Sequence, residues 1–392
     1  MSKLLTLHET EHGQPTLTVT LNPAPQTGEL TEWDELVRTV PGSDVAQLSG
    51  WADVRRAADF EPLFLFVRRS EDLIGGALVL QRKVPVVGMV GYVPYGPLIS
   101  PDVDPESLST VLAVVLRQFA RQTTKVLFIQ PPIGGGHLSG ELQRLGFRPS
   151  NAGIAPAASL RLDLAQDEDT LRAGLRKRLR TWTRAWPKRG VSVRRGTQDD
   201  VALLSRLYAA SAQHQGFEPL SFDYLATLYS LLAADGHAEL FIGEVEGAAV
   251  AARLYTSCGG VLKQRLIGMD RDSEAARLNV PAAVEWEAIR WAKTNGHQWF
   301  DFGGIREAAV PVIEKHADMS KLTNSEVFKA SFGGTPFRYP EAVEIISSPV
   351  IRGGYDLAMR WPRGRRAAYR AASMLRSGRG SGASSKAAMT SQ

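Results

Sequence analysis

Several features that define common classes of protein are missing from this sequence of 392 residues. It contains one cysteine, Cys258, which excludes an internal disulfide. No apolar run reaches the length of about eighteen residues that a transmembrane helix needs, so none is expected. The N-terminal residues lack a secretory apolar core and include Glu9 and Glu11, so we expect no signal peptide. These absences together favour the cytoplasm.

The residue patterns of nucleophilic and metal-dependent enzymes are missing as well. No Ser-His-Asp or Cys-His arrangement can be identified. The segment HETEH, from His8 to His12, matches the pattern of zinc hydrolases. However, it lies at the N-terminus, is followed at once by Gly13, and has neither an apolar helical face nor a third ligand downstream. We therefore expect no metal site and no cofactor.

What the chain does contain is an ordinary globular composition with an uneven charge. Apolar residues make up 44% and charged residues 22%, which is typical of a soluble protein, and the length suits two domains. The net charge is +5, yet residues 172–195 carry ten Lys/Arg and no acid. Residues 352–392 carry nine Lys/Arg and one acid. Two basic segments on an acidic body indicate a polyanionic partner, the plainer alternatives being a solvated helix and a disordered tail.

The hydrophobic pattern predicts an α+β protein in two similar halves. In the first half, strands are expected over 62–69, 73–84 and 89–100, followed by an amphipathic helix over 105–122 and a buried strand over 124–132.

The second half repeats this order: a strand over 158–164, helical stretches, three antiparallel strands within 238–269, a helix from 280 and a strand at 299–305. This order is that of an acetyltransferase-like (GNAT) domain, so we expect two tandem GNAT-like domains.

The predicted domain boundaries follow from these elements. The first domain is expected to cover 1–158 and to be completed by 326–346, and the second to cover 159–325. Residues 347–392 are predicted as a basic C-terminal tail, with a short amphipathic helix around 353–375 and disorder after Arg376.

The most specific segments lie in the C-terminal half. Residues 279–305 contain WEAIRWAKTNG and FDFGGI, and residues 326–340 contain FKASFGG and RYP. The first half adds VAQLSGWADVRRA and GYVPYGPLIS, and a basic stretch leads into GVSV. Taken in order over roughly residues 30–345, these motifs resemble the FemABX family of aminoacyl-tRNA-dependent peptidyltransferases.

That resemblance implies an activity as well as a fold. Two GNAT-like domains are implied, the last strand returning to the first. Family members move an amino acid from aminoacyl-tRNA to an amine of a peptidoglycan stem peptide, carried on lipid II or on its UDP-linked precursor. Aminolysis of an aminoacyl ester is downhill and needs no ATP, metal or covalent nucleophile, which agrees with the absences above.

The resemblance also assigns residues by their place in the motifs. Arg55 is expected to meet the substrate diphosphate, and Tyr95 to line the substrate cleft. Phe328 and Lys329 match the pair at the acceptor site, where Lys329 would stabilise the tetrahedral intermediate or bind the terminal carboxylate of the stem peptide. The family often has Asp where this chain has Ser100, a departure that leaves no carboxylate at this position.

Further candidates come from the segments that flank these motifs. Arg277 and Asn279, which precede the helix starting at 280, are candidate substrate ligands. The insertion 306–326 is expected to be a mobile lid.

The basic segment 172–195 is expected to meet the phosphates of tRNA. The candidate tRNA-binding residues are Arg176, Lys177, Arg180, Arg184 and Lys188. Trp182 or Trp186 is expected either to stack on a base or to lie in the core. The basic tail is expected to add affinity for tRNA or for the inner leaflet of the plasma membrane.

Three alternatives stay open at the level of sequence. One is a tRNA-dependent amide-forming enzyme of natural-product biosynthesis, whose acceptor is a small amine. Another is an acyl-CoA N-acyltransferase, because QRLIGM, from Gln264 to Met269, begins like the turn that holds the pyrophosphate of acetyl-CoA. Asp270, however, stands where that turn needs a small residue. The third is a non-catalytic protein that binds RNA or membranes.

Overall fold

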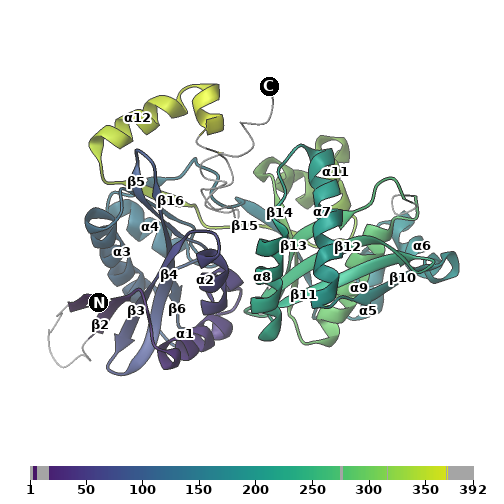
Figure 1. Ribbon diagram of the computed structural model, residues 1–392, viewed down its shortest axis with the longest axis horizontal. Helices are drawn as coiled ribbons and strands as arrows, with labels where there is room; N and C mark the ends of the chain where they lie inside the picture. The colour runs from purple at the N-terminus through teal and green to yellow at the C-terminus, as the bar shows by residue number, and fades with distance from the viewer. Residues whose placement is uncertain (1–2, 7–16, 274–276, 316, 368, 370–392) are drawn as a thin grey trace. The chain divides into compact units, whose positions relative to one another are not determined.

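The computed structural model describes residues 3–6, 17–273, 277–315, 317–367 and 369, which fold into two compact units. The first unit comprises 1–155 and 339–392, and the second comprises 156–338 (Figure 1). The HETEH segment and the end of the predicted tail lie outside the described residues.

The first unit is a mixed α/β layer structure built on one large sheet. Its strands run in the order β1-β2-β3-β4-β5-β7-β16-β8, with β6 paired to β4. Figure 1 shows α1 and α2 on one face of this sheet and α3 and α4 on the other. The elements are β1 (Lys3–Thr6), β2 (Leu17–Asn22), α1 (Thr27–Thr39), α2 (Ser49–Arg56), β3 (Glu61–Arg69), β4 (Asp72–Val84), β5 (Gly88–Val93), β6 (Leu98–Ile99), α3 (Pro105–Gln122), β7 (Val126–Ile129), α4 (Gly136–Arg144), β8 (Arg148–Pro149), β16 (Val343–Ile346) and α12 (Pro349–Met359).

One parallel strand pair organises each unit. In the first, β5 and β7 are parallel and α3 crosses between them. Asp104 caps α3 by accepting from the Ser107 amide, and Pro105 follows as its first residue. The apolar face of α3 then packs into the core of this unit, burying residues such as Leu112 and Phe119.

The second unit has a sheet in the order β10-β11-β12-β13-β14-β9-β15. Here β13 and β14 form the parallel pair, and α9 crosses between them. In Figure 1, α7 and α8 lie on the face of the sheet opposite α9. The elements are β9 (Ala158–Asp163), α5 (Glu168–Gly174), α6 (Lys177–Ala185), β10 (Val191–Arg195), α7 (Val201–Gln215), α8 (Phe222–Ala234), β11 (Ala238–Val245), β12 (Ala248–Cys258), β13 (Val261–Met269), α9 (Val280–Thr294), β14 (Trp299–Ile305), α10 (Val310–Glu314), α11 (Asn324–Ala330) and β15 (Thr335–Arg338).

Two glycines set the distance at which α7 and α9 pack on this sheet. A Cβ on Gly268 would come within 2.8 Å of backbone atoms of Leu207 in α7. A Cβ on Gly243 would come within 2.6 Å of the Val280 and Val284 side chains in α9. Helices therefore sit in direct contact with β13 and β11, and larger residues would push them away.

The predicted boundaries need a correction at the return to the first unit. Residues 326–338 remain in the second unit, since β15 pairs with β9, and only β16 joins the first sheet by pairing with β7. The physical reason is a close backbone approach: a Cβ on Gly334, which has φ +93°, would lie 2.6 Å from the Arg161 carbonyl oxygen. The turn thus returns the chain onto β9 first.

The C-terminal helix also differs from its prediction. The structure begins α12 at Pro349 and ends it at Met359, with Ser348 as the N-cap that accepts from the Ile351 amide. The prediction placed one helix around 353–375, whereas the structure breaks at Arg360 and Trp361 and becomes helical again over 362–367. No helix in the described part of the chain combines the length and apolar character that spanning a bilayer requires.

Candidate functional site

Lys329 is a cation held in the interior of the second unit. It lies in α11, which begins with a capping box between Thr323 and Glu326. The side chain is 9% exposed, and its Nζ donates to the carbonyl oxygen of Gly304 at 2.7 Å. Burial lowers the pKa of Lys329, while the nearby carboxylates of Asp301 and others act in the opposite direction. The ammonium is thus poorly hydrated and fixed in direction.

The FDFGGI segment forms the turn that supplies this carbonyl. Asp301 is fully buried and accepts hydrogen bonds from the Gly303 amide at 2.8 Å and from the Ser159 hydroxyl. Its other oxygen lies 3.4 Å from Arg161 Nε. Gly303 has φ +79°, and a Cβ on Gly304 would lie 2.6 Å from Pro156. Asp301 therefore fixes the turn that holds Lys329 in place.

A second buried carboxylate lies on α9. Glu285 is fully buried and receives hydrogen bonds from Arg253 and from Tyr255, the latter at 3.2 Å. Gln264 donates to both oxygens of Glu285, at 3.1 and 2.8 Å. Burial raises the pKa of Glu285, and the Arg253 guanidinium opposes that rise. The buried ion pair between Arg253 of β12 and Glu285 of α9 thus joins the sheet of the second unit to its crossover helix.

Phe328 links this buried pair to a surface cavity. Its ring lies 5.0 Å from the Arg253 guanidinium carbon and 5.2 Å from the Phe332 ring. The cavity has a volume of about 310 Å³. Its lining residues are Arg176, Arg178, Leu179, Arg277, Asn279, Ala282, Phe328, Ser331 and Phe332. The structure thus brings four predicted site residues together here: Arg176, Arg277, Asn279 and Phe328.

This cavity has positively charged side chains at its rim and apolar side chains at its floor. Arg176, Arg178 and Arg277 are exposed, whereas Leu179 and Phe332 are buried. Asn279 adopts φ +54° as the residue before α9, a conformation that asparagine tolerates better than most residues. Such a lining suits an anionic ligand that also carries a flat or apolar group.

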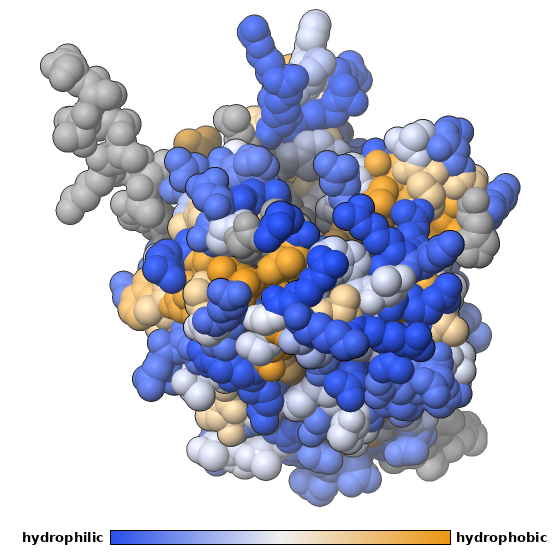
Figure 2. Space-filling model, turned by 90° about the vertical axis from the view of Figure 1, so that its right-hand side faces the viewer, coloured by the Kyte–Doolittle hydropathy of each residue, from blue (hydrophilic) through white to orange (hydrophobic). Residues whose placement is uncertain are grey.

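The exposed surface of α6 continues this positive charge. Seven basic side chains of this stretch are exposed: Arg176, Lys177, Arg178, Arg180, Arg184, Lys188 and Arg189. No carboxylate among the described residues lies within ion-pair distance of these seven. Figure 2 looks onto the side of the second unit that carries α5 and α6, and shows it as mainly hydrophilic with scattered apolar patches. We call these seven residues the α6 basic face.

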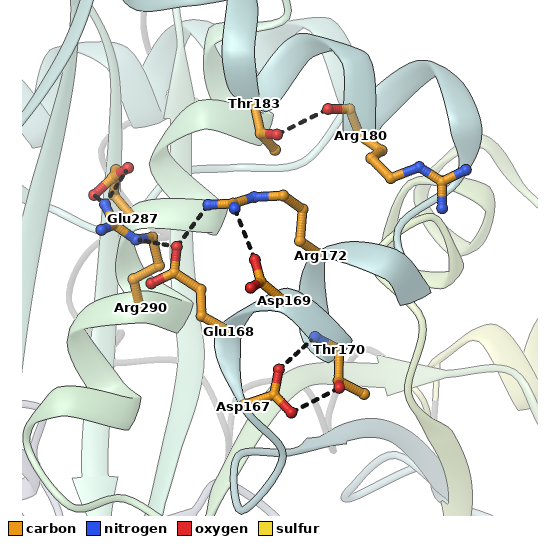
Figure 3. A network of polar contacts seen from close by, with 9 residues as sticks. All are labelled: Asp167, Glu168, Asp169, Thr170, Arg172, Arg180, Thr183, Glu287 and Arg290. Carbon is orange, nitrogen blue, oxygen red and sulfur yellow. Dashed lines mark hydrogen bonds and ion pairs between the residues drawn. The ribbon is translucent and has the colours of Figure 1, made fainter.

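The ends of the basic segment are instead neutralised. Arg172 pairs with Glu168 and Asp169 of its own helix, and Glu168 also meets Arg290 of α9 (Figure 3). Figure 3 shows the Arg180 guanidinium turned away from these acids, and it donates to the Ala173 carbonyl at 2.7 Å.

At the other end of the segment, Arg194 lies between Asp200 and Glu244, at 2.8 Å from each. The hydrogen bonds that Arg194 donates to these two carboxylates raise the pKa of its guanidinium. Arg195 pairs with Glu239 at 2.7 Å. The charge available to a partner is therefore concentrated on the α6 basic face.

The two tryptophans of this segment have different surroundings. Trp186 is 4% exposed and donates from Nε1 to the Leu278 carbonyl at 3.0 Å, so it is a core residue. Trp182 is half-buried, and the Arg189 guanidinium lies 4.7 Å from the centre of its ring. Of the two expectations for Trp186, the structure therefore supports the core.

Arg55 lies in the first unit, at the end of α2. It is 1% exposed, and its guanidinium stacks 4.1 Å from the centre of the Phe60 ring. Arg82 approaches the same ring at 5.3 Å and lies 3.9 Å from Asp59. Two guanidinium groups thus gather around one aromatic ring.

Tyr95 belongs to the loop that follows β5. Its backbone has φ +49°, and its ring packs 5.4 Å from that of Tyr339. The next residue, Gly96, fits tightly, since a Cβ there would lie 2.8 Å from the amide nitrogen of the Gln47 side chain. Gln47 in turn donates to the Pro94 carbonyl at 2.5 Å, so a buried amide sets the shape of this loop.

The insertion 306–326, expected to be a lid, is packed against the second unit. Val310 is fully buried and Ile313 is 8% exposed. Arg306 donates three side-chain hydrogen bonds to the Glu326 carboxylate and so closes the loop at its ends. Burial alone would raise the pKa of Glu326, but the hydrogen bonds from Arg306 and Thr323 hold it at about 2.

The segment QRLIGM has structural contacts at both of its motif positions. Gln264 is bonded to Glu285, and Gly268 is covered by α7. Neither residue faces an open turn that could hold a pyrophosphate. Among the described residues, no group of three or more His, Cys, Asp and Glu side chains is placed to hold a metal ion.

The shared arrangement of a β-meander, a crossover helix and a parallel strand defines the class. The chain is a tandem GNAT-fold protein, as the sequence predicted. A model of the Acetyltransferase (GNAT) domain matches residues 155–309. The fold is similar to that of FemX, with a TM-score of 0.71 and 18% identity over 82% of this chain and 97% of that chain. It is also similar to a tandem GNAT protein from the clavulanic acid biosynthesis pathway, with a TM-score of 0.51 and 14% identity over 89% of this chain and 99% of that chain.

Sequence relatives point in the same direction. The chain is 24% identical over 226 residues to the Lipid II:glycine glycyltransferase of Staphylococcus aureus (strain COL), which covers 55% of this chain and 53% of the relative. The chain thus spans about half the length of the curated relatives it matches. These matches confirm the resemblance to the FemABX family that the motifs predicted.

Sequence reasoning missed the buried charges beneath the site. Arg253 and Glu285 belong to a strand and a helix that are otherwise apolar where they face each other. The available clue was Glu285 itself, an acid one turn before Ile289 in a helix with a regular apolar spacing. Arg178 was also missed, although it lies between two residues of the candidate set.

Proposed function

We propose that this protein is an aminoacyltransferase that moves an amino acid from aminoacyl-tRNA to an amine of a peptidoglycan stem peptide. The acceptor is carried on lipid II or on its UDP-linked precursor. The observation that carries this proposal is the cationic cavity of the second unit, which adjoins the α6 basic face and is lined by Phe328, the neighbour of Lys329. The relatives named as lipid II glycyltransferases support the choice of acceptor.

The arrangement fits the two parts of a charged tRNA. The α6 basic face is suited to the phosphates of an acceptor stem, because exposed guanidinium and ammonium groups displace its counterions. Arg176 and Arg178 continue this charge into the cavity. The flat Phe328 and Phe332 rings are suited to a terminal base or to the aminoacyl group.

The chemistry requires orientation and charge stabilisation. The acceptor amine attacks the ester carbonyl carbon, and a tetrahedral intermediate forms with negative charge on the former carbonyl oxygen. The bond from carbon to the ribose oxygen then breaks, the ribose oxygen gains a proton and the attacking nitrogen loses one. Lys329 is proposed to stabilise the developing charge, or to bind the terminal carboxylate of the stem peptide, from a position that Asp301 and Gly304 fix.

Arg55 and Tyr95 are proposed to bind the acceptor on the first unit, through the diphosphate and the cleft respectively. The Tyr95 ring is held against Tyr339, which supports a preformed cleft wall. Arg55 is 1% exposed and packs on Phe60, so contact between its guanidinium and a diphosphate requires the covering side chains to move. A lipid-linked acceptor would also require the protein to reach the cytoplasmic membrane surface.

The transfer reaction can be tested directly. Purified protein is incubated with total tRNA charged with radiolabelled amino acids and with lipid II or the UDP-linked precursor, with and without RNase. We expect RNase-sensitive label in the muropeptide. Absence of transfer with intact tRNA binding would indicate a small amine as the acceptor. Absence of tRNA binding, together with acetyl transfer from acetyl-CoA, would overturn the proposal in favour of an acyl-CoA enzyme.

A variant then tests the role of Lys329. Lys329→Met is expected to lower kcat/KM for transfer about 100-fold, the usual cost of removing one group that stabilises the transition state. Lys321→Met changes an exposed lysine eight residues earlier in the chain and is expected to retain full activity. If Lys329→Met folds and transfers at the wild-type rate, Lys329 has no part in the reaction.

A further inference from the structure

The helix α12 has one face that holds it to the protein and one that faces solvent. On the inner face, Arg352 donates to Glu344 at 3.0 Å and Tyr355 donates to the same carboxylate at 3.1 Å. Glu344 is 2% exposed and belongs to β16, so the helix is anchored to the edge of the first sheet. These contacts fix which side of α12 points outward.

The outward side is apolar. Val350 is 84% exposed, Leu357 is 58% exposed and Trp361, just beyond the helix, is 65% exposed. The spacing of seven residues places Val350 and Leu357 on one face of α12, and Trp361 lies in the break between α12 and the helical residues 362–367. Three large exposed apolar side chains within twelve residues of a protein surface are unusual unless another surface covers them.

The chain beside the last of these apolar residues is strongly basic. Arg360, Arg363, Arg365 and Arg366 are all exposed and follow one another within seven residues. Among the described residues, none of these four guanidinium groups has a carboxylate within ion-pair distance. The acid of the helix, Asp356, is already bonded to Arg352 and Arg148. The four arginines therefore keep their full charge.

We propose that the outward face of α12, with Trp361 and the arginines that follow, binds the surface of an anionic lipid bilayer. An interfacial helix needs an apolar line to enter the headgroup region and cations beside it to meet anionic lipids. A tryptophan at the boundary between the two suits the headgroup level, because its ring is apolar and its N–H is polar. The inference rests on the proposed function only in that a lipid-linked acceptor lies at such a surface.

Two other occupants fit the observations less well. An RNA would use the arginines but would gain nothing from exposed Val350 and Leu357, which cannot stack on bases. A second copy packed antiparallel on α12 would cover the apolar residues but would bring no free acid to the four arginines, because Asp356, the acid of this helix, is already bonded. A bilayer satisfies the apolar side chains and the cations together.

The test is sedimentation of the full chain with vesicles, which requires no enzymatic activity. Wild type is expected to bind vesicles of phosphatidylglycerol mixed with phosphatidylcholine, to bind phosphatidylcholine alone about tenfold less or weaker, and to lose affinity as salt rises. Leu357→Ser combined with Trp361→Ser is expected to lower partitioning about tenfold or more, because both substitutions remove apolar side chains from the headgroup region. Arg363→Glu combined with Arg365→Glu is expected to do the same.

A matched control uses an exposed apolar residue elsewhere. Phe222, at the start of α8 in the second unit, is 50% exposed, and Phe222→Ser is expected to leave vesicle binding unchanged. Circular dichroism of each variant checks that the fold is retained.

Three results would overturn the inference: no binding of wild type to anionic vesicles at low salt, equal binding by the Leu357→Ser/Trp361→Ser variant, or a dimer of wild type that this variant dissociates. The last result would assign the face to a second copy. Transfer to the soluble UDP-linked precursor should be unchanged in the variants, so failure of the transferase proposal and failure of this inference are distinguishable.

Discussion

The two basic segments of this protein have similar charge and opposite apolar exposure. On α6 and at its C-cap, Leu179 and Trp186 are buried at 5% and 4% exposure and Trp182 is half-buried, so no large apolar side chain is fully exposed beside the basic residues. On α12 and just beyond its end, the apolar residues Leu357 and Trp361 are exposed beside the arginines. Composition alone predicts a polyanion-binding site for both segments.

This difference in apolar exposure shows that the charge of a basic segment does not by itself select its binding partner. A purely cationic, hydrated surface is suited to phosphates, which are reached through charge and need no apolar contact. A surface that offers cations and apolar side chains together is suited to a bilayer, which accepts both. The partner is therefore decided by where the apolar residues of each segment point.

The first prediction compares the buried Trp186 with the exposed Trp361 and has the largest expected magnitude. Trp186→Ala should destabilise the second unit by about 3–5 kcal/mol, since it leaves a cavity and an unpaired Leu278 carbonyl. Trp361→Ala should change stability by less than about 0.5 kcal/mol, because its side chain is in solvent. Native-state hydrogen exchange resolved by peptide measures each unit separately. Equal effects of the two substitutions would remove the distinction drawn between α6 and α12.

A smaller effect is expected on tRNA binding. Arg184→Glu combined with Lys188→Glu should weaken binding of tRNA about tenfold at moderate salt and reduce the slope of log K against log salt by about 2. Arg363→Glu combined with Arg365→Glu should leave both quantities unchanged. Filter binding across a salt series measures them. A larger loss from the second pair of substitutions would assign tRNA to the C-terminal segment.

The last prediction, with the smallest expected magnitude, tests whether Arg194 lies outside the α6 basic face. Arg194 belongs to the same basic segment, but Asp200 and Glu244 already neutralise it. Arg194→Ala should therefore change the salt slope of tRNA binding by less than about 0.3, well below the value of about 0.9 for one phosphate contact. A slope reduced by a full unit in the same filter-binding series would place Arg194 in contact with a phosphate.

Much of the fold was predictable, because local patterns carry it. The apolar alternation of the strands, Pro105 at the start of α3 and the Gly296 stop after α9 all act within a few residues. The boundary error at 326–338 arose because two strands, β15 and β16, follow each other within 12 residues of the chain but join different sheets. Which sheet a short strand joins depends on contacts distant in the sequence, here the approach of Gly334 to Arg161.

The candidate site was also predictable only where local sequence patterns carry it. The motifs led to Phe328 and Lys329, and the segments that flank them led to Arg277 and Asn279. The structure gathers all of these but Lys329 in the lining of one cavity. The motifs gave no role to Arg253, whose partner Glu285 is 32 residues further along the chain. A buried ion pair between distant elements leaves no local pattern, because each residue alone looks like an exception on an apolar face.

The sequence by itself therefore determined the tandem GNAT class, the family resemblance and the presence of two basic segments, because these depend on residue type and spacing. Which basic residues remain without acidic partners, which tryptophan is buried in the core and which carbonyl accepts from the Lys329 ammonium became clear from the folded structure alone. Those outcomes depend on burial and pairing, which are properties of surfaces brought together by folding rather than of neighbours in the chain.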